Sequence, residues 1–160
     1  GEAPLEGTAE TLPAPPAGVV QRRLTFTHGR AHPGLVNIPR HWVRSNPQGT
    51  QIAFLMRDNI GKVQLWLISP DGGEPRQLTR NSSDIQSAFT WHPSGDMLGF
   101  VLDNRMACCD VQTGKVAYLT PERDNAPSGD AVVFSPDGSL LAWMEETGGF
   151  RQLWVTETEK

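Results

Sequence analysis

Residues Phe134 to Trp143 have the sequence FSPDGSLLAW, and residues Trp91 to Phe100 have the similar sequence WHPSGDMLGF. A third version, SNPQGTQIAF, runs from Ser45 to Phe54. In each copy a glycine follows two places after a proline, and the three prolines stand 46 and 43 residues apart: Pro47, Pro93 and Pro136. A repeat of about 40 to 50 residues is typical of propeller blades and of paired helices.

A second marker, the dipeptide Leu-Thr, precedes each Pro-x-Gly segment, at Leu24-Thr25, Leu78-Thr79 and Leu119-Thr120. The Pro-x-Gly segment itself predicts a turn, because proline presets φ near −65° and glycine accepts the positive φ that follows. Two markers in a fixed order indicate that one structural unit is repeated along the chain.

The runs between these turns have the length and composition of strands. Each unit holds up to four of them, short and rich in β-branched, aliphatic and aromatic residues. In chain order they are 41–45, 51–56, 63–68 and 75–79; 87–91, 97–102, 106–111 and 116–120; and 130–134, 140–144 and 152–155. The 16 Gly and 13 Pro leave little room for helices. The sequence therefore predicts an all-β fold, a β-propeller segment of about three four-stranded antiparallel blades.

The units suggest a division of the chain. Residues 1–18, with four prolines, are expected to form a linker or surface excursion, and residues 19–160 a partial β-propeller. The blades are predicted at about 41–79, 86–120 and 129–156, with 19–26 as the outer strand of a preceding or closing blade. Because about four to eight blades make a ring, we expect missing N-terminal blades or a homodimer to complete it.

The motif S-P-D-G-x-x-apolar-Ala-apolar, followed by Gln-Leu-Trp and by GEPRQLT, resembles the propeller repeats of TolB-type proteins. With LPAPPAGVVQRRLTFTH, PGLVNIPRHW and LGFVLDNR, most of the chain is similar to the C-terminal half of the YidR-like family of uncharacterised bacterial proteins. The resemblance implies a bacterial propeller of repeated WD-like blades, and it implies no particular reaction.

The composition excludes some functions. The formal net charge is −4 with no basic block, so we expect no nucleic-acid partner. No apolar run is long enough to cross a membrane. The two cysteines, Cys108 and Cys109, are adjacent and would point to opposite faces of a strand. Two free thiols favour a cytoplasmic protein, with the periplasm as the alternative.

One set of candidate ligand-facing residues comes from the innermost strand of each blade, which lines the channel of a propeller. Six positions before the three prolines stand His41, Ser87 and Asp130, all polar. Equivalent positions on successive blades converge on the axis, so these residues are predicted to face a ligand, although strand starts are also commonly polar because they cap turns.

A second set comes from an insertion in the first unit, between the Leu-Thr marker and Pro47. It carries three of the four histidines, His28, His32 and His41. Neutral imidazoles could close on a divalent metal, and nearby guanidinium groups could hold an anion: Arg30, Arg40 and Arg44. The alternative is an exposed loop with no ligand.

The analogy with oligogalacturonate lyases, which have similar blades and a channel metal, adds Gln86 to His41 as a candidate metal ligand. No catalytic residue is indicated, because the sequence lacks Gly-x-Ser-x-Gly, His-Glu-x-x-His and a phosphate-binding glycine loop. We therefore expect a propeller that binds a protein or a small or saccharide ligand at its channel mouth. The alternative is a metal-dependent lyase or hydrolase acting on an anionic, uronate-type saccharide.

Overall fold

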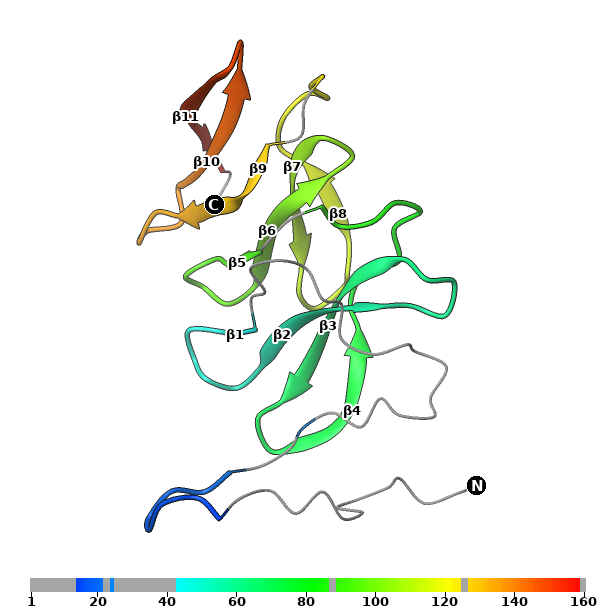
Figure 1. Ribbon diagram of the computed structural model, residues 1–160, viewed down its shortest axis with the longest axis vertical. Coiled ribbons are helices and arrows are strands. Elements are labelled where there is room, and N and C mark those ends of the chain that lie inside the picture. The colour runs from blue at the N-terminus through cyan, green and yellow to red at the C-terminus, as the bar shows by residue number, and fades with distance from the viewer. Residues whose placement is uncertain (1–13, 22–23, 25–42, 87–88, 125–126, 159–160) are drawn as a thin grey trace.

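The computed structural model describes residues 14–21, 24, 43–86, 89–124 and 127–158, with the backbone alone at 128–131. These residues form three antiparallel sheets that follow one another along the molecule (Figure 1). The first sheet contains β1 (Arg44–Ser45), β2 (Ile52–Arg57), β3 (Val63–Ser69) and β4 (Gly72–Gln77). The second contains β5 (Thr90–Trp91), β6 (Met97–Leu102), β7 (Arg105–Asp110) and β8 (Val116–Tyr118). The third contains β9 (Ser128–Phe134), β10 (Leu140–Thr147) and β11 (Phe150–Glu157).

The all-β prediction and the antiparallel meander are confirmed. In every sheet the strands pair in chain order, as β1-β2-β3-β4, β5-β6-β7-β8 and β9-β10-β11. Connections of this kind need only tight hairpin turns, which explains why turn-forming residues recur so regularly in the sequence. Within the described residues no helix is both long and apolar enough to cross a membrane.

The Pro-x-Gly turns join the first two strands of each sheet with one hydrogen-bond pattern. The residue before each proline donates its N–H across the turn, over 2.8 to 2.9 Å: Asn46 to Gln51 O, His92 to Met97 O and Ser135 to Leu140 O. The three glycines have φ values of +70°, +80° and +77°, at Gly49, Gly95 and Gly138. The left-handed conformation that the sequence predicted at these glycines is therefore present in all three copies.

In the first and second sheets the Leu-Thr marker directly follows the last strand and is not part of it. β4 ends at Gln77 and β8 at Tyr118, so the strands predicted to end at Thr79 and Thr120 end two residues earlier than expected, and β4 also begins earlier, at Gly72. The reason is that the threonine hydroxyl accepts the bond that a backbone carbonyl would accept in a ladder. Leu65 N–H donates to Thr79 Oγ1, and Met106 N–H donates to Thr120 Oγ1, each over 3.0 Å.

The apolar side chains fill the spaces between neighbouring sheets. The largest cluster lies between the first and second sheets and includes Leu55, Leu65, Phe89, Leu98 and Phe100. A second cluster lies between the second and third sheets: Val101, Met106, Val132, Phe134, Leu141 and Trp143. Burial of such side chains contributes roughly 1.5–3 kcal/mol each, so the stacking of sheets is the main source of stability.

The outer face of the first sheet carries a third apolar cluster, Phe54, Met56, Trp66 and Ile68, and Leu24 packs against it. Leu24 belongs to the segment 19–26, which was predicted to be an outer strand. Residues 19–21 and 24 are not in a strand, and the others in that segment lie outside the described residues. The division of the chain into a linker at 1–18 and blades thus stays a prediction.

The two cysteines are free, with Cys109 buried and Cys108 half-buried, as expected for neighbours on the strand β7. Burial, followed by the nearby charge of Asp110, raises the pKa of the Cys109 thiol to about 12. Burial also raises the pKa of Cys108. Both groups are therefore protonated near neutral pH, and they act as small core side chains.

Candidate functional site

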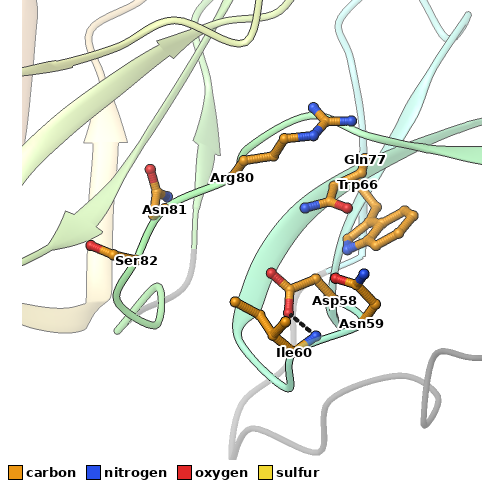
Figure 2. Close-up of a pocket in the computed structure, with 8 residues that line it drawn as sticks. All are labelled: Asp58, Asn59, Ile60, Trp66, Gln77, Arg80, Asn81 and Ser82. Atoms are coloured by element: carbon orange, nitrogen blue, oxygen red, sulfur yellow. Dashed lines mark hydrogen bonds between the residues drawn. The ribbon is translucent and has the colours of Figure 1, made fainter.

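A pocket of about 680 Å³ opens at one end of the first sheet (Figure 2). The turn between β2 and β3 forms one side, and the connector that follows β4 forms the other. β3 and β4 supply the residues between them. The lining residues are Asp58, Asn59, Ile60, Trp66, Gln77, Arg80, Asn81 and Ser82.

Asp58 fixes the shape of the β2–β3 turn. Its Oδ1 accepts the backbone N–H groups of Ile60 and Lys62, at 3.0 and 2.8 Å, and its Oδ2 accepts Gln64 Nε2 at 3.2 Å. The side chain is buried, and its charge is stabilised by three donors. Asp58 therefore acts as the support of the turn that carries Asn59 and Ile60.

Gln64 joins the turn to the connector on the far side of the pocket. This fully buried side chain donates to Asn81 O at 2.8 Å, and its Oε1 accepts Thr79 Oγ1–H at 2.7 Å and Asn81 N–H at 3.1 Å. A buried polar network is rigid when its members are satisfied. The backbone at Asn81 is thus held in a fixed position relative to Asp58.

Trp66 and Gln77 form the wall between these two segments, where they pair directly across β3 and β4. The indole of Trp66 donates to Met56 O at 3.0 Å, and Gln77 Nε2 donates to Thr79 O at 2.8 Å. Both side chains are fixed by these bonds. The wall therefore consists of a largely buried indole next to an amide group.

Two donors at the pocket lack a partner within the part of the chain that the structure describes. Asn81 Nδ2 is buried and makes no hydrogen bond. The guanidinium group of Arg80, on an exposed residue, forms no ion pair there. Donors without acceptors beside a preformed wall are the arrangement expected of a binding site.

In the second sheet, side chains of the chain itself occupy the position that corresponds to this pocket. The position paired across the strands is Ala107 with Tyr118, where the first sheet has Trp66 with Gln77. Tyr118 donates its hydroxyl to Asp103 Oδ2 at 2.5 Å, and the guanidinium of Arg105 lies 4.5 Å from the Tyr118 ring. The pocket is therefore a property of the first sheet and not of the repeat.

A smaller pocket of about 440 Å³ lies between the connector after β8 and the β10–β11 turn. Its cation is paired, since Arg123 Nε lies 3.1 Å from Glu145 Oε2 as an ion pair, although neither atom makes a hydrogen bond. The same guanidinium lies 4.6 Å from the ring centre of Trp154. A cation already held by a carboxylate and an aromatic ring is not available to a ligand, so the larger pocket is the better candidate.

Most of the predicted site residues lie outside the described residues: His28, Arg30, His32, Arg40, His41 and Ser87. Asp130 is placed by its backbone alone, within β9. Arg44 lies in β1, and its carbonyl accepts the indole N–H of Trp91 at 3.0 Å. The ring of ligand-facing residues and the histidine metal site therefore stay predictions.

Gln86 is described, and its amide pairs with Asn104. Nε2 donates to Asn104 Oδ1 at 3.0 Å, and Oε1 accepts Asn104 N–H at 2.8 Å. The Gln86 oxygen supports a hairpin turn, so a metal ion would have to share it. No group of three metal-ligating side chains comes together in the described ranges.

The sequence interpretation did not identify the pocket, although two signals were available. The first sheet has five residues between β2 and β3, at 58–62, whereas the second has only Asp103 and Asn104 between β6 and β7. In addition, Arg80 and Asn81 directly follow a Leu-Thr marker, at a position where the second unit has Pro121 and Glu122. A β2–β3 turn longer than its counterpart, combined with a polar connector after β4, could have indicated a binding site.

Comparison with solved structures identifies the kind of fold that the three sheets form. The chain is 26% identical to TolB from Acinetobacter baumannii, with a TM-score of 0.60 over 74% of this chain and 30% of that one. It is 18% identical to an oligogalacturonate lyase in complex with manganese, with a TM-score of 0.50 over 62% of this chain and 26% of that one. The lyase similarity shows the fold alone. The three sheets are thus blades of a TolB-like β-propeller.

The same chain is 74% identical, over all 160 residues, to "Uncharacterized protein YidR" of Escherichia coli (strain K12). It is a close homologue of that protein, which confirms the resemblance to the YidR-like family. The chain spans 38% of the length of YidR. No protein-family model matches the chain.

Proposed function

We propose that this chain is the ligand-binding part of a TolB-like propeller, and that the pocket lined by Asp58 to Ser82 takes a small polar ligand. The observation that carries the proposal is the pair of unpartnered donors, Arg80 and Asn81 Nδ2, beside a fixed aromatic wall. Ligand pockets of this size typically combine apolar walls with a few well-placed polar groups.

The rigidity of the walls supports binding. Asp58 fixes one side, and Gln64 with Thr79 fixes the other. A preformed site loses little conformational entropy when a ligand enters, so it can give useful affinity with few contacts.

The experiment is a titration followed by amide ¹H–¹⁵N spectra, with neutral monosaccharides, uronic acids, amino acids and small carboxylic acids as probes. We expect at least one probe to shift the amides of Ile60 and of residues 80–82, together with the indole N–H of Trp66. Shifts confined to other parts of the chain, or no shifts with any probe, would overturn the proposal.

A blocked variant and a matched control sharpen the test. Ser82→Phe adds a ring at an exposed lining residue, so it should fill the pocket without disturbing the core. Gln112→Phe adds the same ring at an exposed position outside the pocket. The shifts should disappear in Ser82→Phe and persist in Gln112→Phe; equal responses from both variants would contradict binding at this site.

A further inference from the structure

The pocket also indicates which kind of ligand it takes, and this inference rests on the proposed function. The lining holds one cation and one anion, Arg80 and Asp58. They differ in how accessible they are to a ligand, because Asp58 is 5% exposed whereas Arg80 is an exposed residue. The Asp58 carboxylate already accepts two backbone N–H groups and Gln64 Nε2.

Among the described residues no carboxylate pairs with Arg80, so the charge that a ligand meets at this pocket is positive. A guanidinium presents a planar set of N–H donors that matches the two oxygens of a carboxylate. Asn81 Nδ2 adds a buried donor with no acceptor. An unmet buried donor is unfavourable, and a ligand oxygen that reaches it removes this cost.

The β2–β3 turn adds one apolar side chain, Ile60, to the polar residues Asp58 and Asn59. Ile60 is 71% exposed at the tip of the β2–β3 turn. The ring of Trp66, which is 4% exposed, lines the same pocket, and Figure 2 shows Ile60 and Trp66 across from Asn81 and Ser82. A ligand that contacts both sides must carry an apolar body as well as an acceptor group.

We propose that the pocket recognises a carboxylate attached to an apolar body, with the carboxylate against Arg80 and Asn81 and the apolar body against Ile60 and Trp66. Two sources have this chemistry, a small aromatic or aliphatic acid and the C-terminal residue of a peptide. The shared feature is the anionic group, and the volume of about 680 Å³ admits either source.

The test compares acids with their neutral amides by calorimetric or spectral titration of the whole chain. The probes are phenylacetate with phenylacetamide, and acetyl-Ala-Leu with its C-terminal amide. At low salt each acid should bind about tenfold or more tightly than its amide, the ratio expected when a charge-assisted hydrogen bond replaces a neutral one. The better-binding acid then identifies the source.

Arg80→Gln should bring the acid and the amide to similar affinities while leaving the binding of the amide unchanged. Arg151→Gln, which removes the same charge from an exposed residue of β11, should leave the preference intact. If acid and amide bind the native chain equally well, the carboxylate inference is wrong and the binding site stands. If none of these four probes shifts the pocket amides but one of the probes of the first titration does, the inferred ligand class is wrong. If no probe of either set shifts the pocket amides, the proposed function itself is wrong.

Discussion

His92 connects the second and third blades through a single imidazole. Ser94 N–H donates to His92 Nδ1 at 3.1 Å, and His92 Nε2 lies 3.2 Å from Gly138 O. Because Nδ1 accepts, the proton of the neutral ring is on Nε2, which donates to Gly138. Gln48 makes the equivalent link one blade earlier, donating to Ser94 O at 2.9 Å.

Gly138→Ala should destabilise the chain more than Gly49→Ala. Both glycines have positive φ, which costs an alanine about 1–2 kcal/mol. At Gly138 a β-carbon would also overlap His92 Nε2, whereas at Gly49 it would meet nothing within 4 Å. Losing the His92 link should add about 1 kcal/mol.

The measurement is the free energy of unfolding in urea for both variants, read in the same buffer. Gly49→Ala is the control for backbone strain alone. Equal losses of stability in the two variants would show that the His92 link contributes nothing.

At the scale of the element, the Leu-Thr marker shows how a blade ends. Thr79 Oγ1 accepts Leu65 N–H and donates to Gln64 Oε1, and all three residues are buried. One hydroxyl therefore closes the β3–β4 ladder and orients the amide that links the two sides of the pocket. This double role gives a physical reason for threonine at this position.

Thr79→Val keeps the shape of the side chain and removes the hydroxyl, so Leu65 N–H and Gln64 Oε1 each lose a partner. We expect a loss of about 1–3 kcal/mol in the free energy of unfolding. Thr79→Ser keeps the hydroxyl and removes only a methyl group, which should cost about 1 kcal/mol. Denaturant midpoints for the two variants check this, and a valine variant no less stable than the serine variant would disagree with it.

At the scale of the whole molecule, the third sheet has an apolar face that no described residue covers. Register pairs Val133 and Val155 with Ala142, and Leu153 with Met144, so these side chains share one face. Val133, Leu153 and Val155 are all more than half exposed. The equivalent face of the first sheet is buried against the second sheet.

Exposed apolar faces of this kind are typical of surfaces that associate. We therefore propose that another blade covers it, supplied by further chain or by a second copy, and we expect the isolated 160-residue chain to self-associate. Leu153→Lys should lower the mass measured by light scattering toward 17.6 kDa. Gln112→Lys, which adds the same charge at an exposed position in the second unit, should not. A native chain that is monomeric at all concentrations would contradict this expectation.

The sequence by itself determined the architecture. Turn chemistry at Pro47, Pro93 and Pro136 and the strand-like runs after them depend on neighbours within a few residues, so they can be recognised locally. The same locality explains the errors at the strand ends, because the pattern does not show that the hydroxyl of Thr79 replaces a ladder bond from Leu65, 14 residues away.

Only the tertiary structure decided the pocket. Gln64 meets Asn81 across 17 residues, and His92 meets Gly138 across 46. Contacts of this range depend on turn length and on the stacking of one sheet against the next, which no short window of sequence contains. The length of the β2–β3 turn is written in the sequence, but only the tertiary fold brings this turn and the connector after β4 to the same end of the first sheet.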